Sequence, residues 1–171
     1  GSVSTSGSWD KLKKSEIKPG FTEHLKILSD AGVNLIILEA MTSKDETVET
    51  IIECSSKINL PVWLSISCAM NFNEGKLMHG YQESVTNSKA HFYDYLENSL
   101  LKFTQLHKGP ILVAHSDIKV TGEAVKILKK VHKGPIGAYP NNGYFEKPNW
   151  KLVDDISPSS YLQEAKSWIS N

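Results

Sequence analysis

Short apolar runs alternate with amphipathic stretches along most of the chain. The runs at 33–38, 61–66, 110–114 and 135–139 are apolar almost throughout, which is typical of buried strands. The stretches between them place apolar residues three or four positions apart, as helices with one packed face do. Apolar strands separated by helices predict an α/β fold with a parallel sheet, because parallel strands are covered on both faces.

Local signals predict where several of these helices begin and end. Gly32 follows an amphipathic stretch and is expected to end its helix. Ser43 with Glu46 three residues later has the pattern of a capping box. Thr121 is expected to cap a later helix, and Ser157, which precedes a proline, is expected to cap the last one.

The middle of the chain gives a different pattern. Gly75 and Gly80 predict a loop after the second strand. Apolar and aromatic residues then recur at helical spacing from Phe92 through Tyr95 to Leu106. This spacing predicts one long helix before the third strand.

The sequence His-Lys-Gly-Pro-Ile occurs at 107–111 and again at 132–136. Each copy has the chemistry of a helix-to-strand turn, since glycine can stop a helix and proline cannot prolong it. Two successive units of this kind fit either part of a (β/α) barrel or a doubly wound open sheet. A glycine-rich nucleotide-binding motif is absent from the sequence, which weighs against the open nucleotide-binding sheet.

Composition narrows the range of functions. The 171 residues include 19 basic and 19 acidic side chains, so the formal net charge is zero and no basic footprint for nucleic acid is present. Apolar runs are too short to span a bilayer. The two cysteines, Cys54 and Cys68, form no paired motif, which favours a reducing cytoplasm over a disulfide framework. We expect one domain over residues 1–171.

Polar side chains follow the ends of the predicted strands. Glu39, Ser67, His115, Tyr139 and Asn141 come at or just after the four apolar runs. Chemistry in parallel α/β folds gathers at this edge, so these side chains predict a site for a small polar ligand that carries an amine. Each residue also has a structural interpretation: a loop carboxylate, a hydrogen-bonded histidine or a turn asparagine.

Several segments resemble the homocysteine S-methyltransferase family. Residues 31–41 read Ala-Gly-Val-Asn-Leu-Ile-Ile-Leu-Glu-Ala-Met, and residues 61–67 read Pro-Val-Trp-Leu-Ser-Ile-Ser. The glycine-bounded segment at 75–80 and the Tyr-Pro-Asn motif within 135–143 follow in the family's order, after a glycine-rich start at 1–7. The resemblance covers the chain from the end of barrel strand three through helix seven.

The resemblance implies part of a TIM-type (β/α)8 barrel. Members transfer a methyl group from a donor such as S-methylmethionine or betaine to the thiol of homocysteine, an amino-acid thiol of low molecular weight. They hold zinc with three cysteine thiolates. By the same resemblance, Glu39 binds the substrate's amino group, and Ser67, Tyr139 and Asn141 belong to the substrate site.

The sequence departs from the family at the zinc site. The first zinc cysteine aligns with His115, and the Gly-Gly-Cys-Cys segment that supplies the other two is absent. Imidazole can bind zinc, but we expect the zinc to be absent or incomplete in this chain, and the chain alone to be inactive. Two interpretations stay open: a segment of a longer methyltransferase, or a degenerate domain for binding or interaction. An α/β sugar-phosphate enzyme would need a phosphate-binding glycine loop, for which only the turn at 141–143 is available.

A partial barrel also predicts how the chain associates. It would leave two open strand edges and an apolar inner face that includes Ile36, Leu64 and Leu112 or their neighbours. Open edges and apolar patches favour pairing with another chain. We therefore expect a homo-oligomer or low solubility, with neither nucleic acid nor membrane as a partner.

Overall fold

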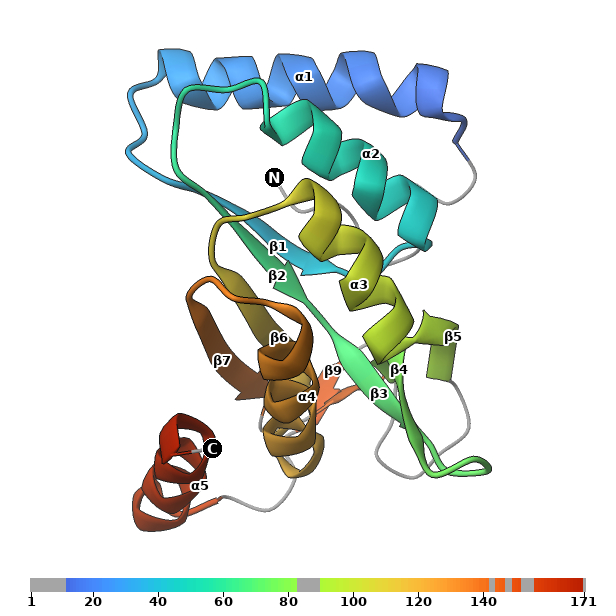
Figure 1. Cartoon of the computed structure of the whole chain (residues 1–171), viewed down its shortest axis with the longest axis vertical. Coiled ribbons are helices and arrows are strands. Elements are labelled where there is room, and N and C mark those ends of the chain that lie inside the picture. The colour runs from blue at the N-terminus through green and yellow to red at the C-terminus, as the bar shows by residue number, and fades with distance from the viewer. Residues whose placement is uncertain (1–11, 83–89, 142–143, 147–148, 152–155, 171) are drawn as a thin grey trace.

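The computed structural model describes residues 12–82, 90–141, 144–146, 149–151 and 156–170. A four-stranded sheet lies at its centre, and each strand in it is parallel to its neighbour (Figure 1). In the order in which they pair, the strands are β1 (Ile36–Met41), β2 (Val62–Ile66), β6 (Ile111–Asp117) and β7 (Ile136–Asn141). These are the four strands predicted from the apolar runs. The α/β class and the sequential parallel order are therefore confirmed.

The helices pack against this sheet. They are α1 (Lys14–Asp30), α2 (Asp45–Ser55), α3 (Leu96–Leu106), α4 (Ile118–Val131) and α5 (Pro158–Ser170). Figure 1 shows α2, α3 and α4 in succession across one face of the sheet, with α1 against α2 and α5 beside α4. Right-handed connections in a parallel sheet whose strand order never reverses place the helices on the same face.

The two faces of the sheet have different surroundings. Ile36 and Leu64 are buried in the core between the sheet and the helices. Side chains alternate along a strand, so Ile37, which is 44% exposed, and Trp63 lie on the opposite face. The expectation that Ile36 and Leu64 line an open inner face is therefore wrong, and their neighbours take that place. Leu112 lies on this second face, since it pairs with Ser65, two residues after Trp63.

A second, antiparallel sheet follows β2 without a turn. It contains β3 (Cys68–Asn71), β4 (Lys76–Gln82) and β5 (Ala90–Tyr95), and a further hairpin is formed by β8 (Tyr144–Glu146) and β9 (Asn149–Lys151). The loop predicted around Gly75 and Gly80 is confirmed only at Gly75, because Gly80 lies within β4. Gly75 has a φ of 63° and forms the tight turn between β3 and β4. Phe92 and Tyr95 lie in β5, so the helix predicted to include them begins only at Leu96.

Two of the predicted helix ends are confirmed. Gly32 has a φ of 81° immediately after the C-cap of α1, a conformation that glycine adopts readily. Ser157 caps α5, since its Oγ accepts a hydrogen bond from the backbone N of Ser160 at 3.1 Å. The turn residues 142–143 and the segment 1–7 lie outside the described residues.

Two other predicted caps are wrong. Helix α2 has Lys44, not Ser43, at its N-cap, and no side chain caps it by a hydrogen bond. Helix α4 is capped by Asp117, whose Oδ1 accepts a hydrogen bond from the backbone N of Lys119 at 2.8 Å. Thr121 lies inside this helix and donates its hydroxyl to the carbonyl oxygen of Asp117.

The repeated His-Lys-Gly-Pro-Ile segments form the same turn twice. His107 and His132 are the C-caps of α3 and α4, each with extended backbone, so the histidine ends the helix rather than the glycine. A Cβ on Gly109 would lie 2.8 Å from the backbone oxygen of Val62 and 3.0 Å from the His107 ring, and one on Gly134 would lie 2.6 Å from Nε2 of His132. The glycine therefore leaves space for both the imidazole and the neighbouring backbone.

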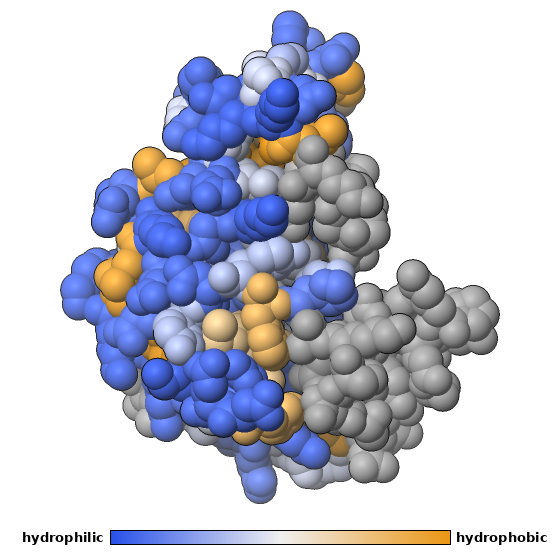
Figure 2. All heavy atoms as spheres, turned by 90° about the vertical axis from the view of Figure 1, so that its right-hand side faces the viewer, coloured by the Kyte–Doolittle hydropathy of each residue, from blue (hydrophilic) through white to orange (hydrophobic). Residues whose placement is uncertain are grey.

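The described part of the face shown in Figure 2 is mainly hydrophilic. Figure 2 shows small separate hydrophobic patches among hydrophilic atoms on the face that it presents. Within the described part of the chain, no helix has both the length and the apolar character to cross a membrane.

Candidate functional site

The carboxyl ends of β1, β6 and β7 bring three predicted site residues together. Nε2 of His115 lies 3.2 Å from Oε1 of Glu39, which is 76 residues away in the sequence. Nδ1 of the same ring lies 3.2 Å from Oδ1 of Asn141. Parallel strands end at one edge of a sheet, which is why such distant residues meet. His115 on β6 therefore bridges the Glu39 carboxylate of β1, which lies two strands away across β2, and the Asn141 amide of the neighbouring strand β7.

Tyr139 completes this group from the next strand. Its ring meets the His115 ring edge to face, with centroids 5.5 Å apart and planes at 77°. Its hydroxyl lies 2.7 Å from Oγ of Ser65. Burial raises the pKa of Tyr139, and the Glu39 carboxylate adds to this, while the Ser65 hydrogen bond opposes it. The phenol is therefore a neutral group at physiological pH. We refer to Glu39, His115, Tyr139 and Asn141 as the strand-end cluster.

The serine that contacts the strand-end cluster is not the one predicted from the sequence. Ser65 was not among the predicted site residues, yet it is the serine bonded to Tyr139. Ser67 is fully buried, and its Oγ makes no hydrogen bond to any residue that the structure describes. Positions 65 and 67 are two apart on one extended segment, so a period of two could have indicated Ser65 as well.

The strand-end cluster is open to solvent on one side. The Glu39 side chain is 60% exposed and the His115 side chain is 38% exposed. A carboxylate in this position can accept a hydrogen bond from a cationic ligand while it keeps its contact with His115. The arrangement therefore places the Glu39 carboxylate, the Asn141 amide and the hydroxyl and ring of Tyr139 around a position that solvent can reach.

The backbone is strained at two points in the site. Ala40 has a φ of 52° and His115 a φ of 51°, and they are the only non-glycine residues with positive φ in the described part of the chain. The pairing of β1 with β2 shifts between Leu38 and Met41, and that of β6 with β7 shifts between Ala114 and Asp117. This conformation costs about 1–2 kcal/mol per residue outside glycine. Strained residues gather at functional sites, which supports a function for this edge of the sheet.

The donors present do not fit the zinc site that the family resemblance implies. Both ring nitrogens of His115 already face Glu39 and Asn141. Cys68 is buried, its Sγ lies 3.5 Å from Oγ of Ser116, and burial raises its pKa to about 11. Such a thiol stays protonated at neutral pH, whereas zinc binds the thiolate. Nowhere among the described residues do three histidine, cysteine or acidic side chains come together to hold a metal.

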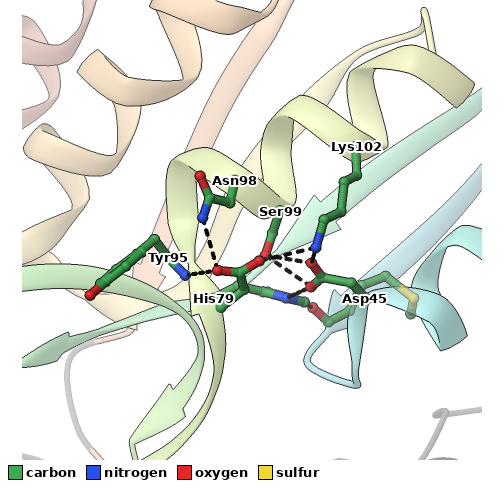
Figure 3. A network of polar contacts seen from close by, with 8 residues as sticks. Asp45, His79, Tyr95, Asn98, Ser99 and Lys102 are labelled. Atoms are coloured by element: carbon green, nitrogen blue, oxygen red, sulfur yellow. Dashed lines mark hydrogen bonds and ion pairs between the residues drawn. The ribbon is translucent and has the colours of Figure 1, made fainter.

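A second polar network, apart from the strand-end cluster, gathers around Asp45 (Figure 3). Asp45, at the start of α2, accepts hydrogen bonds from Nδ1 of His79 at 2.9 Å and from Nζ of Lys102 at 2.7 Å. Oγ of Ser99 also donates to both of its carboxylate oxygens. Burial raises the pKa of Asp45, but the bonds from His79, Lys102 and Ser99 together outweigh it and lower the pKa to about 2. We refer to Asp45, His79, Ser99 and Lys102 as the Asp45 network.

The fold and site define a class of protein. A sequential parallel α/β sheet with an exposed carboxylate, an imidazole and an amide at its carboxyl edge is typical of domains that bind small polar ligands. The sequence matches the family model described as homocysteine S-methyltransferase over residues 1–171. The chain belongs to the homocysteine S-methyltransferase family. A comparison with curated proteins finds no match.

Proposed function

We propose that the strand-end cluster binds the amino-acid part of a homocysteine-like thiol in a methyltransferase-type domain. The observation that carries this proposal is the exposed Glu39 carboxylate at the carboxyl end of β1, beside His115. An ammonium group donates charge-assisted hydrogen bonds to such a carboxylate. The neutral polar groups of Tyr139 and Asn141 suit the carboxylate of the same ligand, because they add no competing negative charge.

The reaction and the fold of the family extend this proposal. In the complete enzyme, the bond from the donor to its methyl carbon breaks as a bond to the homocysteine sulfur forms, and the thiol loses its proton. S-Methylmethionine or betaine would supply the methyl group. The four parallel strands would form part of a TIM-type barrel in a cytoplasmic protein. The exposed face around Ile37 would then be covered by further strands or by a second copy of the chain.

One observation favours a second candidate function, a domain that binds the amino acid without methylating it. His115 takes the place of a zinc thiolate and is held between Glu39 and Asn141. Without a metal-bound thiolate, a substrate thiol with an ordinary pKa near 8.5 stays largely protonated at neutral pH. A homocysteine-binding domain would keep the contact with the ammonium group and lose the methyl transfer.

Glu39→Gln is expected to weaken binding of L-homocysteine by roughly ten- to a hundredfold, since a charge-assisted bond contributes about 1.5–3 kcal/mol. The measurement is isothermal titration calorimetry under reducing conditions. Glu97→Gln is the matched control, because Glu97 is an exposed carboxylate in the first turn of α3. Equal affinity in wild type and Glu39→Gln would show that Glu39 does not bind the ammonium group.

The purified chain is expected to retain no zinc after dialysis against a weak chelator, because its donors do not fit the metal. It is also expected to form no methionine from homocysteine and S-methylmethionine. Metal analysis and an assay for methionine measure the two results. One zinc per chain that is lost on His115→Ala would contradict the first expectation, and methionine formation would contradict the second.

A further inference from the structure

The backbone immediately after Glu39 is held by a buried imidazole. His79 on β4 is fully buried, and its Nε2 lies 2.9 Å from the carbonyl oxygen of Met41. Its Nδ1 lies 2.9 Å from Oδ1 of Asp45. The ring is therefore held at both nitrogens, by the backbone of β1 and by the carboxylate at the start of α2.

The Met41 carbonyl lies beside a strained irregularity of β1 at Ala40, which we call the strained turn. Ala40 separates Glu39 from Met41 and has a φ of 52°, and the register of β1 against β2 is broken over the same residues. An alanine leaves this conformation readily unless the surroundings hold it. The bond from His79 to the carbonyl oxygen of Met41, two residues after Glu39, supplies such a constraint. The direction of the Glu39 side chain depends on this turn, because the turn replaces regular strand geometry.

The imidazole itself has little freedom to move. Its ring meets Phe103 edge to face, with centroids 5.3 Å apart at 83°. Its partner Asp45 is fixed in turn by Ser99 and Lys102 from α3, as the sticks in Figure 3 show. The network thus connects the end of β1 to α2, α3 and β4. A rigid group of this kind can hold a site residue that it does not touch.

We propose that His79 is a positioning residue for Glu39: through its bond to the Met41 carbonyl, it fixes the strained turn that aims the carboxylate into the strand-end cluster. The inference rests on the proposed role of Glu39 in binding an amino acid. His79 lies in the segment that sequence reasoning assigned to a loop, and only the pairing of β3 with β4 places it beside β1.

Two substitutions at one position test this inference in the full chain. A glutamine amide can occupy the place of Nε2 and keep the bond to Met41, whereas an asparagine amide can occupy the place of Nδ1 and keep only the bond to Asp45. His79→Asn is expected to weaken binding of L-methionine at least about fivefold, while His79→Gln stays within about twofold of wild type. If His79 only stabilised the fold, the two variants would weaken binding to a similar extent, because both lose the imidazole.

A measurement without ligand separates this inference from the proposed function. The ring ¹⁵N signals of His115 report its contact with Glu39, and they are expected to shift in His79→Asn but not in His79→Gln. If wild type binds no amino acid and this difference is still seen, the proposed function fails and the positioning role stands. Equal affinities together with equal His115 signals in the two variants would overturn the positioning role.

If both variants fail to fold, the exposed residue that His79 is proposed to position, Glu39, can be substituted instead. Glu39→Gln is expected to shift the ¹³C signal of the Met41 carbonyl and the ring ¹⁵N signals of His79, since coupling between two sites is reciprocal. His107 is the control, because its Nε2 lies 3.2 Å from the carbonyl oxygen of Pro110 in a separate turn. Unchanged signals at both Met41 and His79 would reject the inference.

Discussion

Asp45→Ala is expected to lower the free energy of unfolding by about 2–6 kcal/mol, because two buried groups, His79 and Ser99, lose their hydrogen-bond acceptor at about 1–3 kcal/mol each. The substitution leaves His79 fully buried without its carboxylate, and it removes the acceptor for Ser99 and Lys102. Urea unfolding followed by circular dichroism measures the loss. We expect the largest effect here because Asp45 joins three elements of the fold through its side chain.

Asp94→Ala is the matched control for this prediction. Asp94 also accepts a hydrogen bond from Lys102, at 3.0 Å, but its side chain is 30% exposed. Ion pairs that are open to water contribute about 0–1 kcal/mol, so the control is expected to change stability only slightly. Equal losses in the two variants would show that Asp45 contributes no more than an ordinary surface carboxylate.

The same carboxylate predicts how stability responds to acid. The pKa of Asp45 is lowered from 3.8 to about 2 by the network, although burial opposes this. A lowered pKa means that the folded state favours the ionised form, so the contribution is complete above pH 3.8 and is lost as the pH falls towards 2. Wild type should therefore lose more stability than Asp45→Asn between these two pH values.

Gly80→Ala is expected to cost about 3 kcal/mol or more, because the new Cβ has no space. A Cβ on Gly80 would lie 1.9 Å from the backbone oxygen of His91 on the paired strand β5, and its φ is 148°. The β4–β5 pairing must therefore open. Thermal unfolding measures the change in stability, and hydrogen exchange of β5 amides locates it.

Gly75→Ala provides the comparison for Gly80. Gly75 has a φ of 63°, but no atom lies within 4 Å of the Cβ position. Only the backbone preference is lost, which costs about 1 kcal/mol. If Gly75→Ala proves as harmful as Gly80→Ala, steric contact with His91 is not the reason that position 80 carries glycine.

The parallel sheet could be predicted because its strands are covered by helices and are therefore apolar almost throughout. The antiparallel sheet could not. Its strands mix polar and apolar residues without a regular alternation, and Phe92 and Tyr95 continue at helical spacing into the real helix that begins at Leu96. Residues 90–95 form a strand because they pair with β4, where Gly80 lies close to His91. This pairing is a contact between separate strands, so the local spacing of apolar residues does not show it.

The site shows the same division between local and tertiary information. Glu39 and His115 were predicted because each follows an apolar run, and parallel strands bring such positions together. His79 was not, since nothing near it in the sequence shows that its ring reaches Met41 and Asp45. The choice of Ser67 over Ser65 failed to anticipate the bond to Tyr139, which depends on the register between strands.

The backbone at His115 also restricts how this position can change during evolution. A φ of 51° is tolerated by histidine, asparagine, aspartate and glycine, but β-branched residues are strongly disfavoured there. Few substitutions of His115 are therefore neutral, and an aliphatic replacement such as valine would damage the fold before it altered chemistry. Selection on backbone geometry alone would keep a small or polar side chain facing Glu39, whether or not the domain remains an enzyme.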